Sequence, residues 1–121
     1  MQILILEDYR LFNTAISFNL ENEGHTVHSC FNGNEALKIL KEQDMDLIIS
    51  DLITPQRTGL NFLINLKEGF AINIPIIIIS GLKDAEKLIA EYDLNCIAFY
   101  KKPIDQQLVI DEVSRISNNK N

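Results

Sequence analysis

The segment Gln2-Ile-Leu-Ile-Leu-Glu7-Asp8 opens with an almost unbroken apolar run and ends in two carboxylates. Two similar apolar runs occur later in the chain, at 45–50 and 75–80, and the second of these is almost entirely isoleucine. A strand that is apolar on both faces must be buried on both faces, which is typical of a parallel sheet covered by helices on each side. The three runs therefore predict the centre of an α/β fold.

The stretches between these runs are longer and amphipathic, which predicts helices. Two weaker strands complete the pattern, so we expect five strands alternating with five helices. Right-handed crossovers between parallel strands then give a doubly wound α/β sandwich. The expected strands are residues 2–6, 25–30, 45–50, 75–80 and 96–100, and the expected helices are about 9–22, 34–42, 59–68, 83–92 and 105–116.

The chain has 121 residues, and 46% of them are hydrophobic, which is enough for one domain with its own core. We expect a domain over residues 1–117, followed by a polar tail, 118–121. The formal net charge of -6, with no run of Lys or Arg, argues against non-specific nucleic-acid binding. Neither a secretory signal nor a membrane-spanning run is present, so we expect a soluble, cytoplasmic protein.

The two cysteines, Cys30 and Cys96, lie far apart and follow no metal-binding spacing, so we expect both to be reduced. His25 and His28 are not accompanied by other metal ligands, and we interpret them as surface residues beside a strand.

The first predicted helix has two faces of interest. Leu11 and Phe18, seven residues apart, lie off its apolar stripe, and Asn19 falls on the stripe. An exposed aromatic side chain is a feature of partner surfaces, and partial burial against a neighbouring loop explains it equally well. The stripe itself is formed by Phe12, Ala15, Ile16 and Leu20.

In open α/β sheets, reactive groups gather beyond the carboxyl ends of the strands. The first run ends in Glu7 and Asp8, and the third strand ends in Asp51. The fourth strand ends in Ser80, and the fifth ends in two lysines and a proline, residues 101–103. Three carboxylates, a hydroxyl group and a cation are therefore expected at one edge of the sheet.

Three carboxylates in one crevice repel one another and need a cation. Hard oxygen ligands with room for water suit Mg²⁺. Bound Mg²⁺ and a lysine would let the site take a phosphoryl group, because phosphoryl transfer depends mainly on positioning and charge neutralisation. A single acid at a strand end is equally well explained by the turn that follows it, so this hypothesis depends on all the features together.

These residues, in this order and with these gaps, resemble the response-regulator receiver family over essentially the whole chain. The resemblance implies a flavodoxin-like (βα)5 sandwich whose five-stranded parallel sheet has the order 2-1-3-4-5. The matching elements are Ile-Leu-Glu7-Asp8 after the first strand, Asp51-Leu-Ile-Thr-Pro55 with Gly59 eight residues past Asp51, Ser80 after the isoleucines, and Lys102-Pro103.

The resemblance implies a role for each matching residue. Asp51 is the expected phosphoacceptor, which attacks a phosphohistidine on a histidine kinase or histidine phosphotransfer protein. Glu7 and Asp8 are expected to hold Mg²⁺ with Asp51 and with the backbone carbonyl of Ile53. The domain is then a signalling module rather than an enzyme, with only self-catalysed phosphotransfer and slow autodephosphorylation.

The remaining matches concern the phosphoryl oxygens and the switch. Ser80 and Lys102 are each expected to pair with a phosphoryl oxygen, and the Lys102-Pro103 bond is expected to be cis. Lys101 competes for this role, but Lys102 is the lysine that precedes Pro103. Phe99 lies where the family carries its switching aromatic, although plain strand core also explains it. Movement of Ser80 and Phe99 would repack the surface of the fourth helix, fifth strand and fifth helix.

Further expectations concern partners and lifetime. The first helix starts beside Glu7 and Asp8, so we expect it to dock the phosphodonor, with Leu11 and Phe18 at its margin. Ile53 and Leu82 flank the approach of water in this family, and both are apolar, so we expect a long-lived phosphorylated form. Residues 95–98 lack the acids of members that dimerise through their last helices, which puts that dimer in doubt.

Three alternatives compete with a phosphorylated receiver. A small-molecule or flavin-binding domain of the same fold would need amides after the first strand to cradle a phosphate, where this chain has acids. A phosphatase that uses Asp51 as nucleophile would need a second acid at Ile53 and an inserted cap. A degenerate receiver would act without phosphate, which the complete set of acids, hydroxyl and lysine argues against. Both a free-standing receiver and the N-terminal part of a longer regulator fit the sequence.

Overall fold

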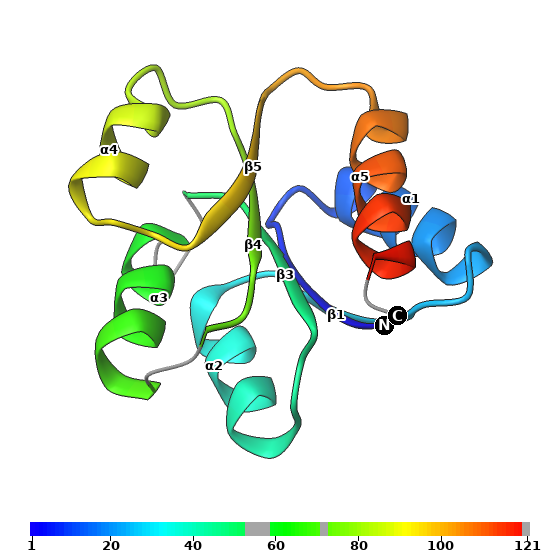
Figure 1. The fold of residues 1–121 in the computed structure, drawn as a ribbon, viewed down its shortest axis with the longest axis horizontal. Helices are drawn as coiled ribbons and strands as arrows, with labels where there is room; N and C mark the ends of the chain where they lie inside the picture. Colours follow the sequence, from blue (N-terminus) through cyan, green and yellow to red (C-terminus); the bar gives the residue numbers. More distant parts are fainter. Residues whose placement is uncertain (53–58, 71–72, 120–121) are drawn as a thin grey trace.

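The computed structural model describes residues 1–52, 59–70 and 73–119. In these residues five parallel strands form one sheet in the order β2-β1-β3-β4-β5 (Figure 1), which confirms the predicted fold and strand order. The strands are β1 (Gln2–Leu6), β2 (Thr26–Cys30), β3 (Leu47–Ser50), β4 (Ile76–Ser80) and β5 (Cys96–Lys101).

Helices cover both faces of the sheet, as the doubly apolar strands require. Figure 1 shows α1 and α5 on one side of the strands and α2, α3 and α4 on the other. The helices are α1 (Arg10–Asn22), α2 (Gly33–Glu42), α3 (Gly59–Asn65), α4 (Ala85–Glu91) and α5 (Gln106–Asn118), and a π-helical turn, η1 (Leu66–Phe70), continues α3.

The sheet has a hydrophobic core on each face. Successive side chains of a strand point to opposite faces, so they belong alternately to the two cores. On one side Ile3, Ile5, Ile49, Ile77 and Ile79 pack with α1 and α5. On the other side the alternate residues of β1, β3 and β4 pack with α2, α3 and α4, and the members of this second core include Leu4, Leu6, Ile48, Ile78, Ala36, Leu40, Phe62 and Leu63.

Local signals define several helix ends. The side chain of Asn32 accepts from the N–H of Glu35 at 2.9 Å at the start of α2, and the carboxylate of Glu35 accepts from the N–H of Phe31 at 2.9 Å. This is a capping arrangement that satisfies N–H groups at a helix start. Asp105 caps α5 as expected, since its side chain accepts from the N–H of Gln107 at 3.0 Å.

The expected start of β2 at His25 is wrong by one residue. The N–H of His25 donates to the carbonyl of Leu20 at 3.2 Å, and Gly24, with φ +95°, donates to the carbonyl of Glu21 at 3.0 Å. These two bonds close the end of α1, so β2 begins only at Thr26. His25 is also buried rather than on the surface, and its ring Nδ1 lies 3.0 Å from the amino group of Met1.

Two other expectations about helices need correction. The buried residues of α1 are Asn13, Ile16, Ser17 and Leu20, whereas Phe12, Ala15 and Asn19 are half-buried. Ile16 and Leu20 of the expected stripe are buried, and Phe12 packs against the same core. The other two buried residues are polar, so apolar periodicity missed the part of the inward face formed by Asn13 and Ser17. Helix α5 continues two residues past the expected end at 116, because no glycine or proline interrupts its hydrogen-bond ladder.

Both cysteines are free in the structure. Cys30 ends β2 and Cys96 begins β5, and these strands are the two edges of the sheet. Four strand spacings, roughly 19 Å, separate them, which is too far for a disulfide. Within the described ranges, no helix is both long and apolar enough to cross a membrane.

Candidate functional site

The carboxyl ends of β1 and β3 bring three acids together. Leu6 and Ser50 are register partners, and the N–H of Asp51 donates to the carbonyl of Leu6 at 3.0 Å. Glu7, Asp8 and Asp51 each offer a carboxylate oxygen, and these oxygens all lie within 4.8 Å of one another. Glu7 and Asp51 are only 3% and 8% exposed, whereas Asp8 is exposed to solvent.

Asp51 is held on both of its carboxylate oxygens. Oδ1 accepts from the N–H of Leu52 at 2.6 Å, and Oδ2 accepts from Nζ of Lys102 at 2.8 Å. Gly59 packs against the backbone of Asp51 so closely that a Cβ there would lie 1.8 Å from the Asp51 carbonyl oxygen. Only glycine fits this approach, which gives a physical reason for its place eight residues past Asp51.

Lys102 joins two of the acids. Its Nζ contacts Glu7 Oε1 as well as Asp51 Oδ2, and it lies 5.4 Å from the ring centroid of Phe12. Lys101 is exposed to solvent, so of the two lysines it is Lys102 that reaches the acids. The Lys102-Pro103 bond is cis, as expected.

Burial and charge shift two pKa values in this cluster. Burial raises the pKa of the Glu7 carboxyl above its ordinary value of 4.5, and this effect outweighs the hydrogen bonds from Lys102 and from the N–H of Tyr9. Burial lowers the pKa of Lys102, but the hydrogen bonds and charges of Asp51 and Glu7 outweigh burial and raise it above 10.5. Lys102 therefore stays an ammonium group throughout the neutral range.

Ser80 and Phe99 lie near the cluster in different environments. Ser80 is buried at the end of β4, where its Oγ accepts from the N–H of Leu82 at 3.1 Å, and its carbonyl accepts from the N–H of Lys102 at 3.0 Å. Phe99 is half-buried on β5 and lines a groove of about 300 Å³ beside Ile89 and Ala90 of α4. Ile53 lies outside the described residues.

Comparison with known proteins identifies the family. A family model for the response regulator receiver domain matches residues 3–114. The chain belongs to this family. Receiver domains are signalling modules of two-component systems, and an acidic pocket that binds Mg²⁺ is typical of them.

Curated relatives and solved structures agree with the assignment. This receiver domain is 30% identical to the transcriptional regulatory protein CrdR of Helicobacter pylori and 31% identical to the probable transcriptional regulator ycf29 of Pyropia yezoensis. The matches cover 97% and 95% of this chain but 55% and 52% of those relatives, so the chain spans about half their length.

Two receiver structures show the likeness in three dimensions. The Francisella response regulator 1452 receiver domain has a TM-score of 0.87 at 25% identity, and the match covers 99% of this chain and 98% of that one. The signal receiver domain of a histidine kinase from Syntrophus aciditrophicus has a TM-score of 0.82 at 28% identity, with 98% and 90% covered.

One residue of the receiver site was missed by sequence analysis. Asn13 of α1 is fully buried beneath the acids, and its amide nitrogen donates to the carbonyl oxygens of Glu7 and Cys30, each at 3.0 Å. No residue pattern marks it, because a polar residue on a helix is expected to face solvent. The one available signal was its position one turn after Tyr9, at the start of the helix that follows the first acids.

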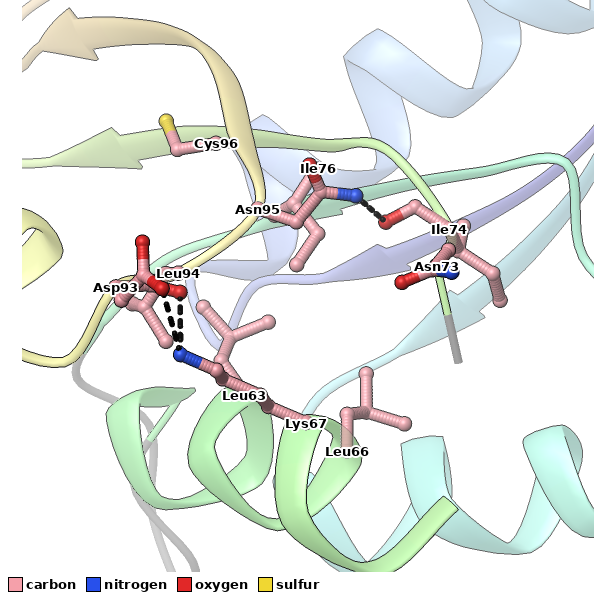
Figure 2. A pocket seen from close by; sticks show the side chains of 10 residues that line it. All are labelled: Leu63, Leu66, Lys67, Asn73, Ile74, Ile76, Asp93, Leu94, Asn95 and Cys96. Atoms are coloured by element: carbon pink, nitrogen blue, oxygen red, sulfur yellow. Dashed lines mark hydrogen bonds and ion pairs between the residues drawn. The ribbon is translucent and has the colours of Figure 1, made fainter. Parts of the chain in front are cut away.

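A second hollow of the receiver domain lies at the opposite end of β4 and β5 and measures about 320 Å³ (Figure 2). Lys67 of η1 spans its rim, and its Nζ donates to the carbonyls of Tyr92 and Asp93 at 3.2 and 2.9 Å. Lys67 thereby ties η1 to the end of α4. No residue of the acidic cluster lines this hollow, so the two sites are separate.

Proposed function

We propose that this receiver domain accepts a phosphoryl group on Asp51 from a phosphohistidine of a histidine kinase or histidine phosphotransfer protein. One observation carries the proposal: the Asp51 carboxylate is held by Lys102 at 2.8 Å, within 4.8 Å of carboxylate oxygens of Glu7 and Asp8. A carboxylate fixed beside a cation and two further acids is suited to receive a phosphoryl group when a divalent ion balances the charge.

The donor set fits Mg²⁺. Three carboxylates against one ammonium group leave an excess of two negative charges, and all the ligand atoms are hard oxygens. Glu7, Asp8 and Asp51 would hold the ion, and the carbonyl of Ile53 is proposed as a further ligand. Bound Mg²⁺ would neutralise charge on the phosphoryl oxygens.

The side chains of the site then have separate tasks in the transfer. A carboxylate oxygen of Asp51 forms the new P–O bond, the P–N bond of the phosphohistidine breaks, and its electron pair stays on the imidazole nitrogen. The ammonium group of Lys102 would move from the Asp51 carboxylate to a phosphoryl oxygen. The hydroxyl of Ser80 would donate to another phosphoryl oxygen, which stabilises the product by charge-assisted bonds.

The bonds from Ser80 and Lys102 to the phosphoryl oxygens would also drive the change of surface that a partner recognises. In the structure Ser80 Oγ accepts from the N–H of Leu82, and turning toward a phosphoryl group would release that contact. Phe99 could then enter the space beside β4 and leave the groove next to α4, changing the surface of α4, β5 and α5. A downstream protein or effector domain would recognise this surface, in keeping with regulators about twice as long as this chain. We place the domain in the cytoplasm, where its two free thiols are compatible with a reducing environment.

Uptake of phosphate tests the proposal. The protein is incubated with acetyl phosphate and MgCl₂, and its intact mass is measured. We expect one phosphoryl group on the parent, and none on Asp51→Asn, whose side chain keeps the shape but loses the nucleophilic carboxylate. Asp84→Asn changes an exposed aspartate that caps no N–H of α4, and it should be labelled like the parent. Equal labelling of Asp51→Asn and the parent would refute the assignment.

A further inference from the structure

Asn13 uses its amide in three hydrogen bonds inside the protein. Its Nδ2 donates to the Glu7 carbonyl and to the Cys30 carbonyl, both at 3.0 Å, and its Oδ1 accepts from Ser17 Oγ at 3.1 Å. Ser17 in turn lies 2.8 Å from Ser29 Oγ of β2. The side chain is 0% exposed, so water supplies none of these bonds.

The carbonyl groups of Glu7 and Cys30 determine which side chain fits at position 13. Glu7 follows the end of β1 and Cys30 ends β2, and the N–H of Glu7 donates to the Cys30 carbonyl at 3.0 Å. A primary amide supplies two hydrogens to the two carbonyl oxygens, which also establishes which way the amide is turned. A carboxylate would face them with like partial charge, and an apolar side chain would leave buried acceptors underbonded, which costs about 1–3 kcal/mol.

Asn13 affects the acidic cluster by holding the backbone of Glu7 in place. Its N–H is bonded to β2 and its carbonyl to Asn13, so both peptide groups of Glu7 are anchored. The carboxylate that projects from this backbone accepts from the N–H of Tyr9 at 2.9 Å and contacts Lys102. Glu7 thus has little rotational freedom left, and its oxygens stay within reach of Asp8 and Asp51.

We propose that Asn13 is a positioning residue for the divalent-cation site, which it maintains by fixing the backbone of Glu7. This inference rests on the proposed Mg²⁺-dependent function and adds a residue that touches none of the reacting atoms. Partners behind the ligands of metal sites commonly change metal affinity by about 10–100-fold. Because Asn13 acts through the main chain of Glu7 rather than on its carboxylate, the lower end of that range applies.

A purely structural role would predict a different result. In that case Asn13 variants would lose stability, and the folded fraction would bind Mg²⁺ as the parent does. The matched control is Val113→Ala, which truncates a fully buried side chain of α5 in the core packed against α1. This truncation should lower stability, and Val113 takes no part in the hydrogen bonds of Glu7, whose partners are Cys30, Tyr9, Asn13 and Lys102.

The test compares Asn13→Leu, Val113→Ala and the parent by NMR titration with MgCl₂ alone, under conditions where each protein is folded. Asn13→Leu should bind Mg²⁺ about tenfold more weakly, and its Glu7 N–H should exchange faster in the absence of metal. Val113→Ala should match the parent in Mg²⁺ affinity. Should Asn13→Leu fail to fold, Asn13→Ser replaces it, since one hydroxyl donor remains and an intermediate loss is expected.

Each outcome has a distinct meaning. Equal Mg²⁺ affinity of the Asn13 variant and Val113→Ala, with the parent binding normally, overturns the role of Asn13 and leaves the proposed function intact. A parent that shows no Mg²⁺-dependent shift at Glu7, Asp8 or Asp51 overturns the metal site itself and this inference with it.

Discussion

In the acidic cluster, burial disfavours the charged form of the carboxylates, whereas the positive charge of Lys102 favours it. Glu7 and Asp51 are almost fully buried, and a buried carboxylate is costly unless a cation compensates for its lost hydration. Lys102 contacts both of them, and Asp8, which is exposed, adds a further negative charge at the mouth of the cluster. The raised pKa of Glu7 records that burial outweighs the compensation from Lys102.

This shift predicts a pH-dependent Mg²⁺ affinity. Mg²⁺ binds the carboxylate form, and Glu7 titrates above 4.5 in the folded protein. Below this raised pKa, affinity should fall by about tenfold per pH unit, and well above it affinity should level off. NMR titrations with MgCl₂ at several pH values measure the curve. Glu7→Gln should bind more weakly and lack this step, and an unchanged step would assign the titration to another group.

The same shift affects folding in the opposite direction when metal is absent. Because protonated Glu7 is favoured in the folded state, its contribution to stability is complete below pH 4.5 and is lost as pH rises through the folded-state pKa. Urea unfolding of the metal-free parent and Glu7→Gln should therefore show a stability difference that changes with pH above 4.5. A difference independent of pH would contradict the shift.

Leu82 leads to a prediction about the lifetime of the phosphorylated form. Its N–H donates to Ser80 Oγ and its side chain is half-buried against the apolar core, so it offers no group to orient a water. With Ile53 it should shield Asp51, and a double change, Ile53→Asn with Leu82→Gln, should speed decay roughly tenfold, or about 1.4 kcal/mol.

Decay is followed by mass spectrometry after the phosphodonor is removed. Leu82→Ala is the control, because it removes bulk without adding a polar group, and it separates loss of shielding from gain of a water-orienting amide. Decay of the double variant at the parent's rate would rule out apolar residues as the cause of a long lifetime.

The positions of these residues could be predicted to different degrees. Glu7, Asp8, Asp51 and Ser80 could be singled out because apolar runs define where strands end, and parallel strands end at one edge. Lys102 was preferred to Lys101 because it precedes Pro103, as in the family motif. Asn13 and His25 could not, since their burial depends on carbonyls and an amino group brought to them by the fold.

Among the elements, α1 combines an unusual inner face with an exposed outer one. Asn13 and Ser17 serve the strand ends, whereas Leu11 and Phe18 are 72% and 63% exposed. The helix begins directly after Glu7 and Asp8, so a protein bringing a phosphohistidine to Asp51 would pass over it. Apolar side chains this exposed are suited to bind such a partner.

We predict that Leu11→Ala and Phe18→Ala slow phosphotransfer from the cognate protein donor by about tenfold each, since truncating an interface anchor commonly costs more than about 1 kcal/mol. Labelling by acetyl phosphate should not change, because that donor is too small to touch α1. Ile97→Ala, an exposed residue of β5, is the control and should leave both reactions unchanged. Equal losses with both donors would instead indicate damage to the fold.

Some element boundaries differ between the sequence prediction and the structure. Strand β1 was predicted to the residue because its apolar run stops at Glu7. Strand β2 starts one residue later than predicted because the N–H of His25 is bonded to the carbonyl of Leu20 at the end of α1. The polar part of the inward face of α1, Asn13 and Ser17, was missed because periodicity counts apolar residues only. The first error comes from a local hydrogen bond that ends the helix and that an apolar pattern does not reveal. The second comes from hydrogen bonds of Asn13 to the ends of β1 and β2, which the fold brings to it.

At the scale of the whole molecule, a hydrophobic core lies on each face of one sheet, and the acids of the site lie at the carboxyl edge of that sheet. The order β2-β1-β3-β4-β5 places β1 and β3 side by side, so residues 44 positions apart, Glu7 and Asp51, become neighbours. Lys102 joins them from the far end of the chain, beyond β5. The matches cover 55% and 52% of the two curated relatives, so nearly half of each relative lies outside the match.

The most direct measurement is to locate the phosphoryl group itself. The protein is phosphorylated with acetyl phosphate and MgCl₂ and then reduced with borohydride, which converts an aspartyl phosphate to homoserine. Peptide mass spectrometry then reads the position. We predict homoserine at residue 51 in the parent, and at no position when Mg²⁺ is withheld by a chelator. Homoserine at Asp8 or at any other aspartate, with Asp51 unmodified, would contradict the account.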